Sequence, residues 1–166
     1  VLAYRMSRDG IRDSDHFGLR SRPFVLGIAG DSGSGKDTLA NAIQGLFGSH
    51  SVAQISGDDY HMWDRDQPLW KTITHLNPRA NDLAAMTNSV IDLAESRTVS
   101  VTPYDHSIGR FARAVSLRHN DFVVVSGLLV FYSPQLRDRC DARIFLDMDE
   151  DLRRYLKIRR DVAIGM

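Results

Sequence analysis

Apolar residues gather along the chain in short runs that predict the strands of a sheet. Phe24–Ala29 and Phe122–Val125 contain no polar side chain, which is typical of strands covered on both faces. We interpret Arg143–Asp147 as a third buried strand. Val52–Ile55 is a shorter run, and Thr98–Thr102 alternates between apolar and polar residues. Together these segments predict a sheet of about five strands.

Longer segments between these runs have the spacing of helices. Lys36–Phe47 and Asp82–Ser96 place their apolar residues on one side, and helical sequence resumes from Asp149 to Val162. Asn81 or Asp82 is suited to cap the second of these helices. Strands that alternate with helices imply right-handed crossovers between parallel strands. We therefore expect a three-layer α/β fold in which a mostly parallel sheet lies between helices.

Length, charge and cysteine content narrow the class of protein. The chain has 166 residues, enough for one domain with a sizeable core. Its formal net charge is zero, so no overall field draws it to nucleic acid or an anionic membrane, and we expect neither partner. Cys140 is the single cysteine, which fits a cytoplasmic protein, and no apolar run reaches the ~18 residues of a membrane span. A homo-oligomer is compatible with this composition.

The two ends of the chain differ from its middle. Residues 1–22 are rich in Arg, Asp, Ser and Gly and follow no apolar period, which predicts a tail or linker. The expected domain comprises residues 23–166. The chain begins with Val1, and Ile164–Met166 follow a helical pattern without a stop signal. We interpret the sequence as a piece of a longer protein, without the C-terminal lid and end of the domain.

A glycine-rich segment lies between the first strand and the first helix. Residues 30–36 match the first seven positions of the P-loop pattern G-x-x-x-x-G-K-[ST]. Phosphate oxygens need several donors at short range, and glycines let backbone N–H groups converge on them. The next helix directs its positive end at the anion, and Lys36 adds a charge for the β- and γ-phosphates. The predicted phosphate-binding residues are Gly30, Asp31, Ser32, Gly33, Ser34, Gly35, Lys36, Asp37 and Thr38.

The position after Lys36 departs from this pattern. A Ser or Thr hydroxyl normally stands there and holds Mg²⁺, whereas this chain has Asp37 followed by Thr38. The order Gly-Lys-x-Thr resembles nucleoside-monophosphate kinases, which implies a phosphate contact for Thr38. Asp37 could hold the metal through water or simply cap the helix.

A pair of carboxylates follows the second predicted strand. Asp58 and Asp59 fall at the carboxyl end of that strand, where parallel α/β folds place their sites. A carboxylate beside a P-loop can deprotonate an acceptor hydroxyl or hold Mg²⁺ through water. The alternative interpretation is a solvated acidic turn.

Further segments resemble the phosphoribulokinase/uridine kinase family of P-loop kinases. Asp58–Arg65 is similar to the Asp-Asp-Tyr-His-x-x-Asp-Arg stretch of plant and cyanobacterial phosphoribulokinases, and Leu76–Asp82 to their Leu-Asp-Pro-Arg-Ala-Asn-Asp. Pro103–His106 parallels the Tyr-Asn-His of those enzymes and the Tyr-Asp-Phe of uridine kinases. Gly127–Ser133 looks most like uridine kinase. The resemblance covers residues 24–164 and implies the fold of a P-loop kinase.

The resemblance also implies roles for individual residues. Asp58 takes the place of the catalytic base, and Lys36 acts beside it. Lys157 and Arg160 fall where the family places cations near the lid and the phosphates. His75 has no ligand spacing and receives no role. The implied substrate contacts are Asp59, Tyr60, His61, Arg65, Arg79, Tyr104 and His106, of which His61 and Arg65 match positions that phosphoribulokinases use toward a sugar phosphate.

Two positions differ from the family. The usual acid before Gly-Leu is Ser126 here, and Asp37 replaces the hydroxyl after Lys36. The two differences suggest the hypothesis that an acid has moved from one side of Mg²⁺ to the other. The candidate metal ligands are Asp37, Thr38 and Asp58.

The expected activity is transfer of the γ-phosphoryl group of ATP, with Mg²⁺, to a hydroxyl of a small molecule. The acceptor is open between a uridine- or cytidine-like nucleoside, slightly favoured, and a pentose phosphate. Ser126 and Asp37 motivate an alternative, a catalytically weak ATP-binding regulatory module of a larger protein. A GTPase-type switch is a further alternative, although the chain has no Asn-Lys-x-Asp segment to read guanine.

Overall fold

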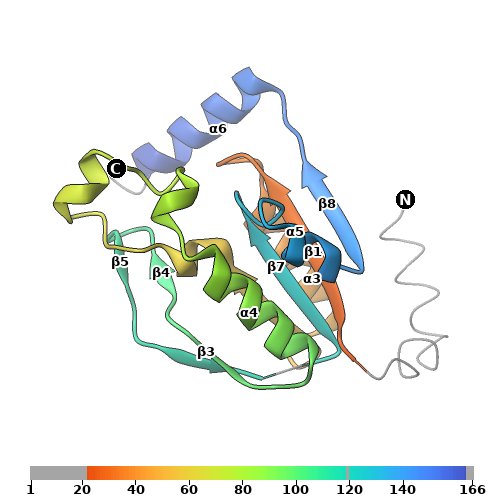
Figure 1. Cartoon of the computed structure of the whole chain (residues 1–166). Coiled ribbons are helices and arrows are strands. Elements are labelled where there is room, and N and C mark those ends of the chain that lie inside the picture. The colour runs from red at the N-terminus through yellow and green to blue at the C-terminus, as the bar shows by residue number, and fades with distance from the viewer. Residues whose placement is uncertain (1–21, 119, 164–166) are drawn as a thin grey trace.

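A parallel sheet forms the centre of the structure, a computed structural model that describes residues 22–118 and 120–163 (Figure 1). Its four strands follow the order β2-β7-β1-β8. The strands are β1 (Phe24–Gly30), β2 (Val52–Ser56), β7 (Phe122–Gly127) and β8 (Ala142–Leu146). All neighbouring strands are parallel, as the alternation of strands and helices predicted.

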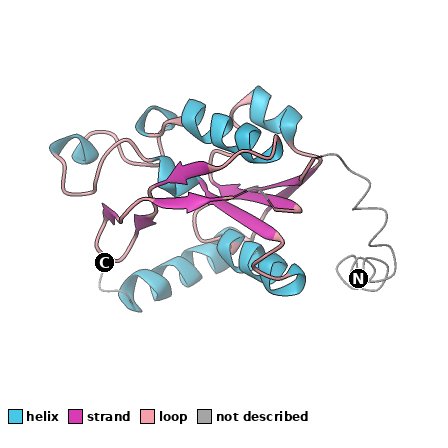
Figure 2. Cartoon of the chain, turned by 90° about the horizontal axis from the view of Figure 1, so that it is seen from below, coloured by secondary structure: helices cyan, strands magenta, loops and turns pink. Residues whose placement is uncertain are grey.

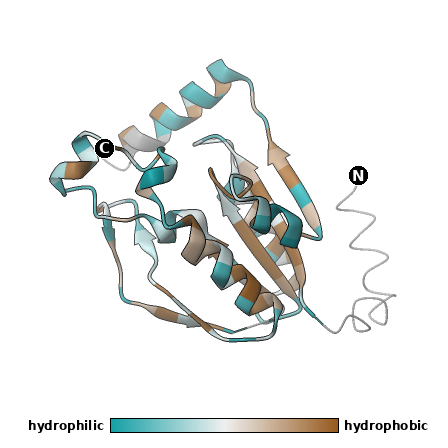
Figure 3. Ribbon diagram, in the orientation of Figure 1, coloured by the Kyte–Doolittle hydropathy of each residue, from teal (hydrophilic) through white to brown (hydrophobic). Residues whose placement is uncertain are grey.

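Helices cover both faces of this sheet, which confirms the three-layer α/β fold (Figure 2). On one face, α3 (Lys36–Phe47) packs through Ala40 against Ile28 and Val124. On the other face, α4 and α5 pack against a cluster that includes Val25 and Val123. Figure 3 shows hydrophobic residues along the central strands and on α4. The remaining helices are α4 (Leu83–Ala94), α5 (Pro134–Arg139) and α6 (Glu150–Ala163).

The strand predicted at Arg143–Asp147 exists as β8, but the prediction that it is buried is wrong. The side chain of Phe145 is 65% exposed, and Arg143 is exposed as well. The reason is its position, because β8 pairs with β1 on one side only and is an edge strand among the described residues. An apolar run shows that a segment pairs into a sheet, but it does not show how many of its faces are covered.

Two small antiparallel pairs lie outside the central sheet. β3 (Val99–Val101) pairs with β6 (Val115–Leu117), and β4 (Tyr104–Asp105) pairs with β5 (Arg110–Phe111). The alternating segment at Thr98–Thr102 is therefore a strand, as predicted, but it does not join the parallel sheet. This explains why the described central sheet has four strands rather than about five.

Of the two residues predicted to cap α4, Asp82 is the one that does so. Its oxygen accepts a hydrogen bond from the N–H of Ala85 at 2.8 Å, so Asp82 is the N-cap. The neighbouring Asn81 side chain is engaged elsewhere, with His61 and two backbone carbonyls. Three 3₁₀-helices precede α4: η1 (Gly57–Tyr60), η2 (Pro68–Lys71) and η3 (Pro78–Ala80).

The predicted tail falls almost entirely outside the described residues, as does the segment 164–166. Arg22, its last residue, is described: the guanidinium donates two hydrogen bonds to the carboxylate of Asp141, at 3.0 and 2.6 Å. Asp141 also accepts from the N–H of Val25 at 2.9 Å, so it ties Arg22 to the start of β1. Among the described residues, no helix has the length and apolar character needed to cross a membrane.

Candidate active site

The order of the strands brings three predicted segments together. β7 lies between β1 and β2, so Ser126 at its end stands between the P-loop that follows β1 and Asp58 that follows β2. One cavity of about 930 Å³ is lined by Lys36, Asp58 and Ser126. Such crevices at the carboxyl ends of parallel strands are where α/β folds bind ligands. The phosphate cradle and the predicted base therefore share one cavity.

Three glycines of the P-loop, Gly30, Gly33 and Gly35, have positive φ. Gly30 has φ of +154°, and a Cβ there would lie 2.5 Å from the carbonyl oxygen of Leu146. Gly35 has φ of +87° in the left-handed region and begins α3 as its N-cap. The N–H groups in the first turn of a helix point out of its N-terminus, and this is where helices bind anions such as phosphate. The cradle therefore fits the phosphates of a nucleotide.

The positive charge of the cradle comes from Lys36 and from α6. The Nζ of Lys36 donates to the backbone carbonyl of Asp31 at 2.8 Å. α6 lies against the loop, because a Cβ on Gly33 would be 3.5 Å from that of Lys157, which also lines the cavity. Arg153 of the same helix approaches the carboxylate of Asp31 at 3.6 Å. The side chain of Arg160, predicted to be near the phosphates, lies outside the described part of the chain.

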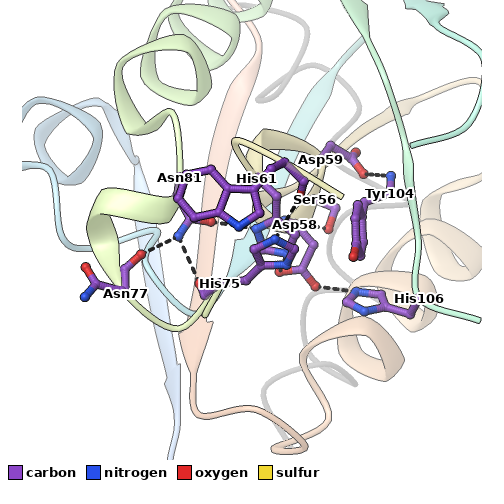
Figure 4. A network of polar contacts seen from close by, with 10 residues as sticks. Ser56, Asp58, Asp59, His61, His75, Asn77, Asn81, Tyr104 and His106 are labelled. Carbon is purple, nitrogen blue, oxygen red and sulfur yellow. Dashed lines mark hydrogen bonds and ion pairs between the residues drawn. The ribbon is translucent and has the colours of Figure 1, made fainter. Parts of the chain in front are cut away.

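The carboxylate of Asp58 has a different neighbour on each oxygen (Figure 4). Its Oδ2 accepts from Nε2 of His106 at 2.8 Å, while its Oδ1 is 3.7 Å from Nε2 of His61. Burial alone would raise the pKa of Asp58. The hydrogen bond and charge of His106, with the charge of Lys36, outweigh this effect and hold the pKa below its usual value. Asp58 is thus ionised at neutral pH, the state that a general base requires.

Asp59 and Tyr60, both predicted substrate contacts, do not line this cavity. Asp59 accepts from the N–H of Tyr104 at 2.9 Å and so ties β4 to η1. Burial, with the charge of Asp58, raises the pKa of Asp59 despite that hydrogen bond. Tyr60 belongs to the hydrophobic core, and burial raises the pKa of its phenol. Both residues therefore stabilise the segments around the cavity and do not form its wall.

Two stacked histidines form part of the cavity wall. The rings of His61 and His75 are 3.7 Å apart between centroids, and both residues line the cavity. Burial lowers the pKa of His61 to about 4, against the opposing charge of Asp58, so the imidazole is neutral at pH 7. Burial also lowers the pKa of His75, whose Nε2 lies 2.9 Å from the carbonyl oxygen of Trp63. Sequence reasoning missed His75, because its spacing from other site residues carries no signal.

The remaining predicted substrate contacts differ in their placement. Arg65 and His106 line the cavity, together with Trp70. Tyr104 does not line the cavity; its ring packs edge-on against that of His106, with 5.1 Å between the ring centroids. Arg79 is exposed on η3 and is not part of the cavity wall. Its role in substrate binding therefore finds no support in this arrangement.

The candidate metal ligands line the same cavity, with Asp37 and Thr38 on the first turn of α3 and Asp58 beyond the end of β2. Within the described ranges, no three acidic, histidine or cysteine side chains are grouped closely enough to hold a metal ion by themselves. Mg²⁺ in kinases is usually bound through one or two carboxylates, water and the substrate phosphates. The donor set fits an ion that arrives with the nucleotide.

Comparison with known proteins agrees with this arrangement. Residues 25–164 match the model of the phosphoribulokinase/uridine kinase family. The chain belongs to this family. A phosphoribulokinase of Synechocystis sp. is 33% identical over 142 residues, which cover 86% of this chain and 43% of that protein. A uridine kinase of Ligilactobacillus salivarius is 30% identical over 145 residues, covering 86% of this chain and 68% of that enzyme.

Solved structures of other proteins share the fold of this chain. A protein described as a possible uridine kinase of Bacillus stearothermophilus superposes with a TM-score of 0.61 at 20% identity, covering 97% of this chain and 96% of that one. The phosphoribulokinase of Rhodobacter spheroides gives a TM-score of 0.67 at 18% identity, covering 85% of this chain and 57% of that one. This chain thus spans less than half of the curated phosphoribulokinase and about two thirds of the uridine kinase.

Proposed function

We propose that this chain carries the active site of an ATP-dependent kinase that phosphorylates a hydroxyl group of a small molecule. The observation that carries the proposal is the shared cavity, with Lys36 of the P-loop at one side and the ionised carboxylate of Asp58 at the other. Membership of the phosphoribulokinase/uridine kinase family supports the same reaction.

Different residues of the chain carry out the separate steps of the proposed reaction. The backbone of Gly33–Lys36 and the Lys36 ammonium hold the β- and γ-phosphates, and Asp58 accepts the proton of the acceptor hydroxyl. Mg²⁺, when bound, neutralises charge on the transferring phosphoryl group. Phosphoryl transfer needs little covalent help, so positioning and charge neutralisation supply most of the acceleration.

The acceptor end of the cavity favours a neutral nucleoside over a pentose phosphate. His61 is buried and neutral, and its Nδ1 is engaged with Asn81, so it presents an acceptor nitrogen rather than a positive charge. The rings of Trp70 and His75 provide flat apolar surface for a base. Arg65 supplies a positive charge in the same wall, which keeps the pentose phosphate as the second candidate.

The proposal is tested by measuring ADP release from ATP with a panel of nucleosides, pentose phosphates and pantothenate. We expect a uridine- or cytidine-like nucleoside to give the highest kcat/KM, because the wall around His61 accepts hydrogen bonds. ATP binding without phosphorylation of any compound would contradict the kinase and favour the regulatory ATP-binding module instead. Tight GTP binding without competition from ATP would favour a GTPase-type switch.

The metal proposal is that Asp37 compensates for Ser126. Both residues line the cavity, and each departs from the family pattern. We expect Asp37→Ala to weaken ATP binding about tenfold in the presence of Mg²⁺, roughly 1.4 kcal/mol, because a carboxylate that holds the ion is lost. In EDTA the affinity should stay level or rise, since a negative charge near the phosphates is removed. Isothermal titration calorimetry measures both values.

The double variant Asp37→Ser with Ser126→Glu restores the arrangement usual in the family. We expect it to recover the Mg²⁺-dependent affinity that Asp37→Ser alone loses. Equal affinity of Asp37→Ala and the unmodified protein in Mg²⁺ would refute the compensation.

A further inference from the structure

The orientation of the Asn81 side-chain amide is decided by its surroundings. Its Nδ2 lies 2.9 Å from the carbonyl oxygen of His75 and 2.8 Å from that of Asn77, two groups that only accept hydrogen bonds. Its Oδ1 lies 2.7 Å from Nδ1 of His61. The opposite orientation would face an oxygen toward both carbonyls and lose two hydrogen bonds, so this amide has one good orientation (Figure 4).

The backbone holds Asn81 in place beside His61. The two residues form an isolated antiparallel bridge. The N–H of Asp82 donates to the carbonyl of Tyr60 at 2.7 Å, and the N–H of Met62 donates to that of Ala80 at 2.9 Å. The amide therefore reaches His61 from a fixed position.

The amide orientation assigns the tautomer of His61. Because Oδ1 of Asn81 can only accept, Nδ1 of His61 must carry the proton and donate it. The imidazole makes no hydrogen bond to Asp58 through Nε2, as expected where that nitrogen carries no proton. Its Nε2 is consequently a bare lone pair, and it lies 3.7 Å from Oδ1 of Asp58.

The two oxygens of Asp58 therefore meet different partners. Oδ2 accepts from Nε2 of His106 at 2.8 Å, so it is already occupied. Oδ1 faces the bare nitrogen of His61 and receives no hydrogen bond from it. If His61 carried its proton on Nε2, a small rotation would let it donate to Oδ1 and compete with an incoming hydroxyl.

We propose that Asn81 is a positioning residue that keeps the proton of His61 on Nδ1, so that Oδ1 of Asp58 stays open to the acceptor hydroxyl. The effect on His61 stands on the geometry alone, whereas the consequence for the acceptor rests on the proposed kinase function. Asn81 also lines the cavity, and the proposal assigns its effect on the reaction to its hold on His61.

Nuclear magnetic resonance tests the first half without any substrate. A two-bond ¹H–¹⁵N correlation spectrum of the ¹⁵N-labelled 166-residue chain at pH 8 reports which ring nitrogen of each histidine carries the proton. The His61 signals are assigned from their loss in His61→Gln. We expect the proton on Nδ1 in the unmodified protein and on Nε2 in Asn81→Ala, where the acceptor for Nδ1–H is gone.

Steady-state kinetics with the acceptor found by screening test the second half. We expect Asn81→Ala to lower kcat about tenfold, a fraction of the ~10²–10⁴ that a general base contributes, because His61 now competes for Asp58. The KM for ATP should not change, since the P-loop is untouched.

Two variants separate this role from a structural one. Asn77→Ala removes the oxygen that caps η3 by accepting from the N–H of Arg79 at 3.0 Å, so it loosens the same turn without touching His61. It should keep the tautomer and kcat of the unmodified protein. Asn81→Asp keeps an acceptor for Nδ1–H but turns an oxygen toward both carbonyls; it should retain the Nδ1 proton and give a kcat between those of Asn81→Ala and the unmodified protein.

A proton on Nε2 of His61 in the unmodified protein would overturn the proposal, and so would an unchanged tautomer in Asn81→Ala. This first measurement needs no variant that perturbs folding at Asn81. A tautomer change with normal kcat would overturn the catalytic half. A tautomer change in a protein that phosphorylates no acceptor would uphold the action of Asn81 on His61 and count against the proposed function.

Discussion

Replacing Asp58 by asparagine is expected to lower kcat by about 10²–10⁴-fold, the range that a general base supplies. The amide is nearly the same size and leaves the 3₁₀-helix η1 intact, but it cannot take the proton of the acceptor hydroxyl. ATP binding should change little, because the phosphate cradle lies on a different strand end. Initial rates of ADP formation and calorimetric titration with a non-hydrolysable ATP analogue measure the two effects separately.

Asp66→Asn is a matched control for this change. Asp66 is exposed and pairs with Arg110, so its substitution alters one carboxylate of the chain away from the cavity. Exposed ion pairs contribute little, and we expect normal turnover and stability. Undiminished turnover in Asp58→Asn would eliminate Asp58 as the base and leave its contact with His106 as a structural one.

Replacing Lys36 by methionine is expected to weaken ATP binding about 100-fold, roughly 2.7 kcal/mol, because a charge-assisted contact to the phosphates is lost. Methionine keeps the length and apolar stem of the side chain. The ligand-free fold should tolerate the change, because the hydrogen bond from the Lys36 ammonium to the carbonyl of Asp31 is exposed. The rise in melting temperature on adding ATP should therefore shrink strongly while the melting temperature without ATP changes little.

Lys71→Met serves as the control for this variant, because Lys71 is exposed at the end of η2 and does not line the cavity. Lys71→Met changes the net charge of the chain by the same amount. It should leave the ATP-induced rise in melting temperature unchanged. Full stabilisation of Lys36→Met by ATP would show that the loop does not use this lysine to bind phosphate. Lys36→Arg is not a conservative alternative, because the planar guanidinium has a different shape and donor geometry.

Local sequence was sufficient for features that depend on neighbouring residues. The P-loop is recognisable because backbone geometry, helix terminus and lysine all come from one short segment, Gly30–Thr38, and the structure shows positive φ at Gly30 and Gly35. The cap of α4 was also within reach, since Asp82 accepts from a residue three positions later. Both features arise from contacts between residues that are close in the chain.

Features that depend on contacts between distant segments of the chain were predicted less well. Burial of β8 could not be read from its apolar run, because exposure of Phe145 depends on which strands pair beside it. His75 carries no motif, yet the turn between η2 and η3 stacks its ring on that of His61. Whether a side chain joins the cavity wall or a hydrogen-bond network depends on partners that spacing along the sequence does not identify.

Periodicity and contiguous motifs in the sequence encode the four strands of the central sheet, the helices α3, α4 and α6, the phosphate cradle and the family. Contacts that form only in the folded chain set which oxygen of Asp58 is occupied by His106, which nitrogen of His61 carries its proton, and that Asp59 supports β4 rather than the cavity. Protonation, tautomer and burial depend on charges and hydrogen bonds within a few ångströms, and here those partners come from segments up to 48 positions apart in the chain.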